Sequence, residues 1–471
     1  MRILALDLGT SSVRGLVLDA GARPLPDALA RRRIPLEIRD GGVATIDGPA
    51  YLAALVACLD DLSDAGHLDG VELVATAAQW HSVVPLDPGG DPRGPVLTWL
   101  DTRPVAPAGV PGPADPDAFH QRTGTWWHRV YWSIRLPWLR EQLGGGPIRF
   151  AGLVEYVLGR LLTESVMSVS QASGTGLLDL SALDWDPEAC ELAGVRPGEL
   201  PTLAPPRWSG RLRPDYATRW PALRAARWAP PLGDGAASNI GCGCYDTRRV
   251  AVTVGTSAAV RLVQFAPAGG ELPPLPDQLW RYRMDHDHVV TGGAFSDGGS
   301  LYAWARRELR LPEGPELDRA LARVPPSGGP VRADPRLGGD RPPGQAPGGS
   351  GVLAGIGLNT TAVEILAGLM AALCAQTDDV VSTIESTLDH RVEAVLGGGA
   401  VAASAWWRQA FAVALAPREV WHARNPEIGA VGAALVAIGR LDGASGVDRI
   451  VRTDEGMSGT ATRGDLRQYS S

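Results

Sequence analysis

The feature that most constrains this chain is a strand–turn–strand pattern that occurs twice, far apart in the sequence. In the first copy, Ile3–Leu8 and Val13–Asp19 are apolar runs around a Gly-Thr-Ser-Ser turn that begins at Gly9. In the second copy, Val250–Val254 leads into a Gly-Thr-Ser-Ala turn and Val260–Val263 returns. With a one-residue gap, Gly-Thr-Ser and a following Val-Arg match in both copies. The repeat predicts two halves built on one plan, with a boundary just before Val250.

The length of the chain agrees with this division, because 471 residues fit two large domains better than one core. We expect an N-terminal domain over residues 1–247, a C-terminal domain over residues 248–440, and a tail over residues 441–471 to which we assign no function. Strand hairpins combined with helices make each half an α/β layer structure. Apolar residues at three- and four-residue spacing predict helices at Leu153–Leu162, Ala362–Leu388 and Ile428–Ile438.

Two long stretches rich in proline and glycine, Pro85–Pro116 and Pro325–Gly351, interrupt these patterns. We interpret them as irregular loops within the domains and not as linkers between independent domains. Loops of this length in a compact domain often bind ligands.

Composition excludes several classes of protein. A net charge of -8 and a pI near 5.6 argue against a nucleic-acid binder, which normally carries a basic surplus. Asp7 comes too early for a secretory signal, and the apolar stretch Ile365–Cys374 is too short to span a bilayer, so we expect a soluble, cytoplasmic protein with no membrane partner. The five cysteines are scattered without CxxC spacing and indicate neither a disulfide framework nor a zinc site.

The chain contains no lysine, so all 44 of its Lys and Arg residues are arginine. A Walker A loop and a protein kinase each need a lysine that reaches the nucleotide phosphates. Both classes are therefore excluded, together with enzymes that form a Schiff base on lysine. If the protein uses ATP, then backbone amides, hydroxyls, Mg²⁺ and arginine must hold the phosphates.

Each Gly-Thr-Ser turn offers successive backbone N–H groups and two hydroxyls, an arrangement that suits phosphate oxygens. One such turn alone is more often a plain polar hairpin turn. Two copies facing one cleft would hold a polyphosphate from both sides.

Asp7, near the end of the first strand, has no acidic counterpart in the second copy, where Thr253 takes its place. A carboxylate there suits Mg²⁺ held directly or through water, and the alternative is that Asp7 only caps the turn.

A third element places Asp234 between two glycines at the start of a helix of small residues. The glycines leave the carboxylate accessible, as a general base for a hydroxyl requires, although a Gly-Asp-Gly turn alone is more often just a turn. A fourth element combines amide, imidazole, carboxylate and guanidinium groups with aromatic faces, which is how proteins bind polyols. Its residues, which we expect to line a sugar pocket, are Gln79, Trp80, His81, Asp101 and Arg103.

The ordered set of these motifs resembles the FGGY carbohydrate kinases over about Arg2 to Arg440. The amino-acid sequence after the Gly-Asp-Gly turn is most similar to that of gluconokinase-type members, with xylulokinases next. The resemblance implies an RNase H-like fold in each half, as in the actin-like ATPases, with ATP and a sugar in a central cleft. The motifs are DLGTSSVRGLVLD, QWHS, WLDTR, SGTGLLDLSALDWD, GDGAASNIGCGCYD, VTVGTSAAVRL, GGAFSDGGSLYAW and GGGAVAASAWWRQAFA.

The resemblance also implies roles for individual residues. Asp7 would orient Mg²⁺, Asp234 would be the base, and the five residues of the fourth element would line the sugar pocket. Among the residues of the two turns, Thr10 and Ser11 would face the transferred phosphate and Thr256 the nucleotide phosphates. Further residues assigned to the nucleotide are Ser12, Arg14, Gly255, Gly398, Gly399 and Ala400, the last three on the adenosine side.

Three departures from the family pattern bear on substrate choice and nucleotide affinity more than on the chemistry. Arg135 replaces a lysine of the family's first signature, and a planar guanidinium is not a point charge. Val413 and Ala367 stand where members commonly have acidic residues. His286 and His288 suggest a metal site, but a solvated hairpin is the simpler interpretation, because no further ligands cluster nearby in the sequence.

Taken together, the sequence predicts an ATP- and Mg²⁺-dependent kinase of a small sugar or sugar acid, best D-gluconate, to whose carboxylate Arg103 and Arg135 could bind. A xylulokinase or another polyol kinase is the first alternative. A sugar- or nucleotide-binding regulator that kept the fold and lost turnover is the second, and the presence of both Asp7 and Asp234 disfavours it. A homodimer is compatible with the sequence.

Overall fold

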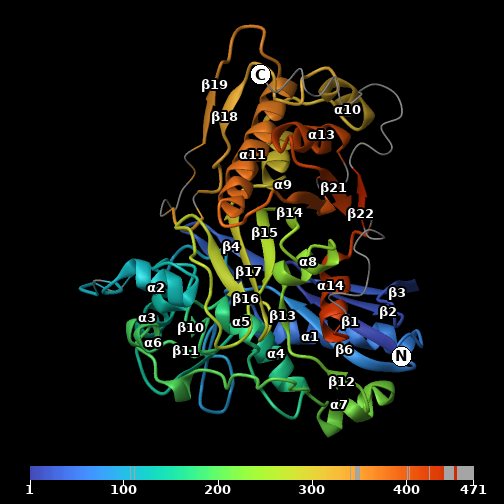
Figure 1. The fold of residues 1–471 in the computed structure, drawn as a ribbon. Helices are drawn as coiled ribbons and strands as arrows, with labels where there is room; N and C mark the ends of the chain where they lie inside the picture. The colour runs from blue at the N-terminus through green and yellow to red at the C-terminus, as the bar shows by residue number, and fades with distance from the viewer. Residues whose placement is uncertain are drawn as a thin grey trace.

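The structure is a computed structural model, and it consists of two α/β halves, one above the other in Figure 1. Each half is built around one large sheet, and helices cover the faces of both sheets. The residues that it describes are 1–106, 108–110, 112–339, 341–344, 349, 351–399, 401, 404–423, 425–439 and 450–452.

The sheet of the first half has the strand order β12-β6-β1-β2-β3, and β13 also pairs with β6. Strands β1, β2 and β3 are antiparallel neighbours, whereas β6 runs parallel to β1, and β12 and β13 run parallel to β6. The strands are β1 (Arg2–Leu8), β2 (Ser12–Leu18), β3 (Pro24–Arg33), β6 (Val71–Ala78), β12 (Arg227–Trp228) and β13 (Leu232–Gly233).

The sheet of the second half repeats this order in its central strands, as β17-β15-β14-β20-β21, with β16 and β22 added at the two edges. Again the first three strands are antiparallel and the next two parallel. The prediction of two halves on one plan is therefore confirmed. The strands are β14 (Arg249–Val254), β15 (Ala258–Phe265), β16 (Trp280–Arg283), β17 (His288–Phe295), β20 (Glu393–Gly397), β21 (Val420–Ala423) and β22 (Ile450–Arg452).

Each half has its own hydrophobic core on the outer face of its sheet. In the first half, α1 (Gly48–Asp64) and α4 (Leu153–Leu161) pack together, and α1 lies on β2 and β3. In the second half, α11 (Ala362–Glu385) packs against α9 (Gly299–Glu308) and α13 (Ala405–Ala414). α11 is long and apolar enough to cross a membrane by length and composition, and many of its side chains are buried in this core.

Two helices join the halves at the centre of the molecule. α8 (Asp234–Gly241) follows β13 of the first half, and α14 (Ile428–Ala437) comes from the second half (Figure 1). They pack against each other backbone to backbone, because a Cβ at Gly432 would collide with the carbonyl of Ala237 and one at Gly241 with the carbonyl of Ile428. α14 also packs on β1, β2 and β6 of the first sheet.

Smaller elements complete the fold. The helices are α2 (Pro116–Thr123), α3 (Trp132–Gln142), α5 (Val169–Ser173), α6 (Pro187–Leu192), α7 (Pro214–Arg219), α10 (Pro315–Leu321) and the 3₁₀ turns Pro197–Glu199 and Pro221–Leu223. The short strands are β4 (Leu36–Arg39), β5 (Val43–Ile46), β7 (Val84–Leu86), β8 (Val96–Leu97), β9 (Arg149–Ala151), β10 (Leu178–Asp179), β11 (Asp184–Trp185), β18 (Arg332–Asp334) and β19 (Val352–Ala354).

The predicted hairpins and the three predicted helices are confirmed within a few residues at their ends. The two loops predicted to be irregular are more ordered than expected. The first contains β8, which pairs with β5, and the second contains β18, which pairs with β19. Strands of two or three residues carry too little periodicity to be recognised in a sequence. Part of the predicted tail also belongs to the fold, because β22 pairs with β21.

Candidate active site

The residues predicted to carry the chemistry lie directly at or after the ends of parallel strands. In the first sheet, β1, β6 and β13 end side by side, and Gly9, Gln79 and Asp234 follow within a residue of those ends. In the second sheet, Gly255 follows β14 and Gly398 follows its parallel neighbour β20. Ligands of open α/β sheets bind outside the carboxyl ends of the strands. The two sheets thus present their binding edges to one region.

Strand alternation sets which side chains face the other half. Along β1, Leu4 and Leu6 belong to the outer core, so Asp7 shares the opposite face with Ile3 and Ala5, which pack toward α8 and α14. The duplicated position in β14, Thr253, has the same inward orientation, because its neighbours on either side lie in the outer core.

The arginines of the two hairpins differ in register, because Arg14 is opposite Asp7, whereas Arg261 is opposite Ala251, two residues before Thr253. Arg14 Nη1 lies 3.6 Å from Asp7 Oδ2 and 3.0 Å from Glu427 Oε2, which belongs to the second half. Arg261 Nη1 donates to Thr253 Oγ1 at 2.7 Å. Arg14 therefore has two acidic partners, whereas the strand partner of Arg261 is neutral. This places Arg14, predicted to bind the nucleotide, in an ion-pair network between the halves.

A cavity of about 140 Å³ lies between the halves. A cavity holds one water when roughly 10–15 Å³ is accessible to it, so this space is large enough for a small molecule. Both halves contribute side chains, and aromatic rings and arginines dominate the lining. The lining residues are Trp80, His81, Trp99, Val130, Tyr131, Asp234, Ser257, Ala258, Ala259, Arg261, Trp280, Tyr282, Ala294, Arg341 and Pro342.

Asp234 is the first residue of α8, as the sequence predicted, and its carboxylate lines this cavity. Its Oδ1 accepts a hydrogen bond from Gly235 N at 2.7 Å. Burial raises the pKa of Asp234, and the nearby guanidinium of Arg261 opposes part of that rise. The flanking glycines have a further role that the sequence did not reveal, because the indole of Trp80 packs against both Gly233 and Gly235.

His81 lines the same cavity in an uncommon backbone conformation, with φ of 66°. Its Nδ1–H donates to the carbonyl of Gly174 at 2.6 Å. Burial lowers the pKa of His81 to about 3, so the ring is neutral near pH 7. A neutral imidazole that donates through Nδ1 has Nε2 as a hydrogen-bond acceptor, which suits a substrate hydroxyl.

The first Gly-Thr-Ser turn is connected to the cavity through Trp99, which lines it, whereas Gln79 is not among the lining residues. Thr10 Oγ1 donates to Gln79 Oε1 at 3.0 Å and accepts from Trp99 Nε1 at 3.1 Å. Thr10 thus joins two motifs that are far apart in the sequence. Ser11 is exposed at the tip of the turn, whereas Ser12 begins β2 and is buried.

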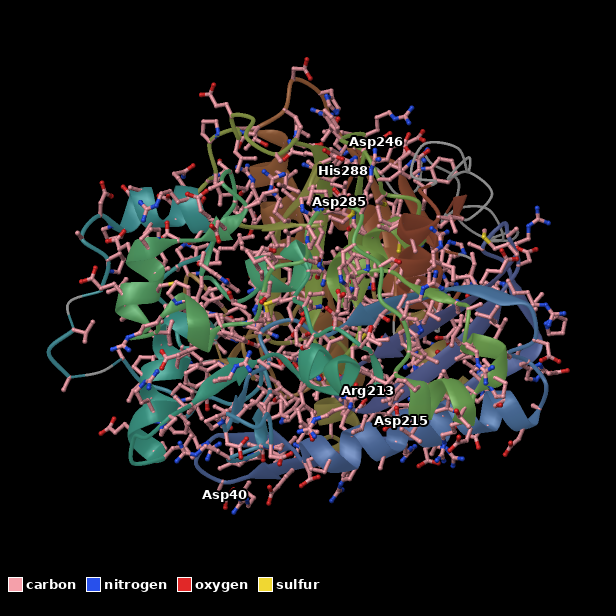
Figure 2. The ribbon with its side chains drawn as sticks, turned by 90° about the horizontal axis from the view of Figure 1, so that it is seen from below. Asp40, Arg213, Asp215, Asp246, Asp285 and His288 are labelled. Atoms are coloured by element: carbon pink, nitrogen blue, oxygen red, sulfur yellow. The ribbon has the colours of Figure 1, made fainter. Side chains whose placement is uncertain are left out.

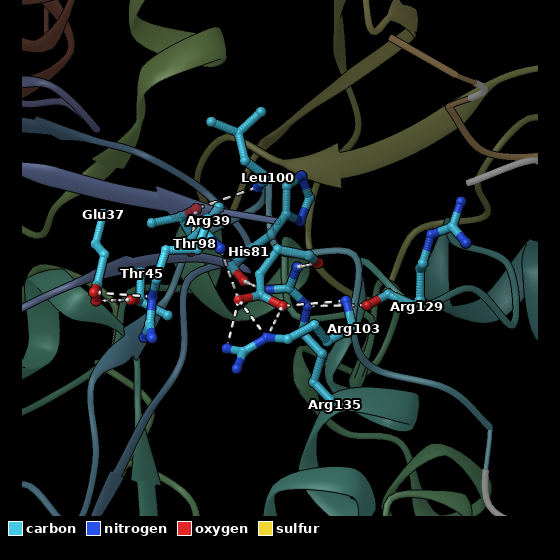
Figure 3. A network of polar contacts seen from close by, with 11 residues as sticks. Glu37, Arg39, Thr45, His81, Thr98, Leu100, Arg103, Arg129 and Arg135 are labelled. Atoms are coloured by element: carbon cyan, nitrogen blue, oxygen red, sulfur yellow. Dashed lines mark hydrogen bonds and ion pairs between the residues drawn. The ribbon is translucent and has the colours of Figure 1, made fainter. Parts of the chain in front are cut away.

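Like Gln79, the predicted sugar-pocket residues Asp101 and Arg103 do not line this cavity. Asp101 is buried, accepts from Ala44 N at 3.0 Å, and forms an ion pair with Arg103 at 2.7 Å (Figure 3). Arg135 lies beside them and donates to the carbonyls of Arg129 at 2.9 Å, His81 at 3.0 Å and Asp101 at 3.2 Å. Both guanidiniums predicted to bind a substrate carboxylate are therefore engaged within the protein.

The second turn lies at the N-terminus of α9. Gly299 N donates to the carbonyl of Gly255 at 2.7 Å, and Ser300 N donates to that of Thr256 at 3.1 Å. Gly255 and Thr256 are exposed, as phosphate-binding residues need to be.

The predicted adenosine turn lies next to this second phosphate turn. Gly398 has φ of 104° and touches the backbone of Val254 at a place where a Cβ would not fit. Gly399 has open space where its side chain would be, and Ala400 lies outside the described residues.

The histidines considered for a metal site lie away from the cavity. His288 Nδ1 is 3.0 Å from Asp285 Oδ1 at the turn between β16 and β17, and Figure 2 shows the two side by side. Among the described residues, no group of three or more His, Cys, Asp or Glu side chains is arranged to hold a metal on its own.

Sequence reasoning missed several residues of the cavity. Tyr131, Trp280, Tyr282 and Arg341 all line it, and Tyr131 and Tyr282 bond to each other through their hydroxyls at 2.8 Å. Arg261 was visible in the duplicated Val-Arg match but received no role. The others gave no local signal, because only the packing of the two halves brings them together.

The chain matches a known protein family along most of its length. The model of the FGGY family of carbohydrate kinases, N-terminal domain, matches residues 2–241, and that of the C-terminal domain matches residues 250–439.

Individual relatives and solved structures agree with this match. A gluconokinase of Bacillus subtilis is 25% identical over 86% of this chain and 81% of its own. A xylulose kinase of Streptomyces rubiginosus is 27% identical over 94% of this chain and 88% of its own. Among solved structures, a gluconate kinase from Lactobacillus acidophilus superposes with a TM-score of 0.84 at 22% identity, covering 99% of this chain and 95% of the other, which shows the shared fold.

Proposed function

This chain belongs to the FGGY family of carbohydrate kinases, and we propose that it transfers the γ-phosphoryl group of ATP to a hydroxyl of a small sugar acid, best D-gluconate. The substrate part of this proposal is supported by the gluconokinase and gluconate kinase among the similar proteins. The two domains that we expect at residues 1–247 and 248–440 would contribute the sugar site and the adenosine site respectively.

The observation that carries the proposal is the composition of the cavity between the halves. It combines one carboxylate, Asp234, with a neutral histidine, several aromatic rings and two arginines. Aromatic faces and hydrogen-bond acceptors suit a polyol. Because the arginines outnumber the single carboxylate, the lining favours a substrate that carries a negative charge.

In the proposed reaction, Asp234 accepts the proton of the attacking hydroxyl as that oxygen forms its bond to the γ-phosphorus and the bond to the leaving β-phosphate oxygen breaks. The raised pKa of Asp234 brings its basicity closer to the operating pH, as general-base catalysis favours. His81 Nε2 would accept a second substrate hydroxyl and orient the chain. Phosphoryl transfer depends mainly on such positioning and on charge stabilisation.

The two turns would hold the phosphates without lysine. The N–H groups of Gly9 and Gly255 donate within the turns, to the carbonyls of Ser12 and Ser257. The backbone N–H groups of Thr10, Ser11 and Thr256, with the hydroxyls of Ser11 and Thr256, would therefore face the phosphates from the two sides. The N-terminus of α9 lies against the second turn, and a helix N-terminus favours bound anions. Ser12 and Arg14 would contribute indirectly, through the shape and charge of the first turn.

The residues present fit Mg²⁺ as a partner of ATP. Burial raises the pKa of the Asp7 carboxyl to about 6 despite Arg14 beside it, so Asp7 would gain from a nearby cation. Mg²⁺ commonly takes one or two carboxylates together with substrate phosphates, and Asp7 would supply such a ligand directly or through water. When bound, Mg²⁺ neutralises phosphate charge.

An assay of ADP release with and without sugars tests the proposal. We expect release that depends on D-gluconate, with a higher kcat/KM than for D-xylulose or glycerol. Equal or faster turnover of D-xylulose at subsaturating concentrations would overturn the substrate assignment and leave a polyol kinase. Release without any sugar would indicate an ATPase, and no release at all would indicate a binding protein that lost turnover.

A further inference from the structure

Two arginines line the cavity, and one of them, Arg341, forms no ion pair with a described residue. Asp234 acts on Arg341 electrostatically, but its interaction with Arg261 is the stronger one. Arg341 belongs to the loop between β18 and β19, within the second half, and its Cζ lies 4.1 Å from the ring centroid of Trp99 in the first half. Among the residues that the structure describes, no carboxylate lies within ion-pair distance of this guanidinium, and none of its N–H groups has a hydrogen-bond partner. Arg341 therefore presents five donors that are not used within the described protein.

The other arginines near the cavity are not free in this way. Arg103 is paired with Asp101, and Arg135 is bound to three backbone carbonyls. Arg261 donates to Thr253 and lies beside Asp234, whose negative charge it offsets.

We propose that Arg341 recognises the carboxylate of the substrate, so that selectivity for sugar acids resides in the β18–β19 loop of the second half. This inference rests on the proposed function and names the residue that would bind the carboxylate of the sugar acid.

The setting of Arg341 suits this role. A guanidinium stacked on an indole face is held in one plane, and its edge is free to bind a carboxylate through two parallel hydrogen bonds. The loop is anchored close by, because Gly338 N donates to Asp297 Oδ2 at 2.7 Å. A turn within the loop follows Arg341, where Gly344 N donates to its carbonyl at 2.8 Å. Burial lowers the pKa of Arg341 to about 10, which is the cost of a desolvated cation that an anionic ligand would offset.

Charge also decides which arginine takes the carboxylate. Asp234 interacts more strongly with Arg261 than with Arg341, so a substrate anion next to Arg261 would be repelled more by Asp234 than one next to Arg341. The hydroxyl to be phosphorylated must approach Asp234, whereas the acid group of an extended sugar acid lies at a different carbon. Arg341 is the cation of the cavity lining that remains for the acid group.

The test compares two substrates that differ only in the group at one end of the chain. D-Glucitol is D-gluconate with a CH₂OH group in place of the carboxylate. We expect Arg341→Gln in the full chain to lower kcat/KM for D-gluconate by about 10- to 100-fold, the loss typical of a charge-assisted hydrogen bond. The value for D-glucitol should change less than about threefold. If D-glucitol is not turned over, its inhibition constant against D-gluconate replaces kcat/KM.

Two further variants make the result specific. Arg341→Lys keeps the charge without the planar fork and should give an intermediate loss for D-gluconate. Arg336→Gln removes an arginine of the same loop that pairs with Asp334 at 2.6 Å, and it should leave the preference for D-gluconate over D-glucitol unchanged. If Arg341→Gln does not fold, as judged by thermal unfolding, Arg341→Lys and Arg336→Gln provide the same comparison.

The outcomes separate the inference from the proposed function. Equal losses for both substrates would mean that Arg341 serves the fold or the nucleotide, and an unchanged D-gluconate value would place the acid group elsewhere. Either result overturns the inference and leaves a gluconate kinase. A wild-type chain that phosphorylates only neutral sugars would instead overturn the proposed function, and the inference with it.

Discussion

The indole of Trp80 packs so closely on Gly235 that a Cβ built on this glycine comes 2.6 Å from Cζ3 of the ring. The guanidinium of Arg261 approaches the same point, with Nε at 2.7 Å. The residue after the proposed base thus lies against both an aromatic ring of the first half and a cation of the second. Both of these side chains line the cavity. A movement of either one away from Gly235 would therefore change the shape of the cavity.

Gly235→Ala should therefore displace Trp80 or Arg261 and damage the site. We expect a loss of stability of about 1–3 kcal/mol, typical of overpacking, together with a raised KM for the sugar. Urea unfolding and steady-state kinetics measure the two effects. Gly198→Ala is the control, because no atom lies within 4 Å of the added Cβ. Normal sugar kinetics in Gly235→Ala would show that the indole and the guanidinium can shift without cost.

Asp234→Asn keeps the shape of the side chain but cannot take a proton. We expect turnover to fall by roughly 10²–10⁴-fold, as for loss of a positioned base, while nucleotide affinity changes much less. Single-turnover kinetics and titration with an ATP analogue separate the two quantities. The matched control is Asp246→Asn, since Asp246 pairs with Arg248 at the surface. Near-normal turnover in a folded Asp234→Asn protein would place the base elsewhere.

Arg135→Lys restores the lysine that the family has at this position and tests whether this chain needs arginine there. The Arg135 side chain is fully buried and binds three carbonyls that point from different directions, which one ammonium cannot satisfy together. An unpaired buried acceptor costs about 1–3 kcal/mol, so the unfolding midpoint should fall. The KM for the sugar should rise more than that for ATP, because one of the carbonyls belongs to His81.

Arg219→Lys is the control for this prediction. It alters an exposed ion pair with Asp60, and such pairs contribute little to stability. If Arg135→Lys proves as stable as Arg219→Lys, the three hydrogen bonds of Arg135 are dispensable.

Glu155 provides a prediction about pH that does not involve the cavity. Its side chain is buried in α4, and burial raises the pKa of Glu155 to about 8 from an ordinary 4.5. Folding favours the protonated form of Glu155. The stability that this group contributes is therefore fully present below about pH 4.5 and is lost as the pH rises through about 8.

Glu155→Gln removes the titration and keeps the shape. The stability of the variant relative to wild type should improve by roughly 1 kcal/mol per pH unit between pH 6 and pH 8. Urea unfolding of both proteins at the two pH values measures this. A difference that stays constant with pH would mean that the Glu155 carboxyl titrates in its ordinary range.

Much of the fold could be predicted because its signals are local. Alternating apolar residues identify the two hairpins, and the Gly-Thr-Ser turn that they share is enough to indicate the duplication. The helix at Ala362 has an uninterrupted helical period and a capping box between Thr361 and Glu364. Asp234 could be placed at a helix start because glycine and small residues surround it in the sequence.

The site was only partly predictable, since its other features depend on contacts across the chain. Asp101 and Arg103 have the composition of a sugar pocket, but two residues of separation allow them to pair with each other instead. Arg14 was expected at the phosphates, and its second partner, Glu427, is more than 400 positions away. Arg341 lies in a segment rich in proline and glycine, where no period indicates which side chain will point inward.

The glycine-mediated contact between α8 and α14 is a place where the backbones of the two halves lie close together. Any rotation of one half relative to the other about that contact would displace nearby groups little and distant groups more. Asp234 is the first residue of α8, one of the two helices that make this contact, and would move little. Arg341 is joined to the second half through β18 and β19, which form a two-stranded sheet of their own. Because Asp234 and Arg341 line one cavity from the two halves, such a rotation would change the spacing between the proton acceptor and the guanidinium.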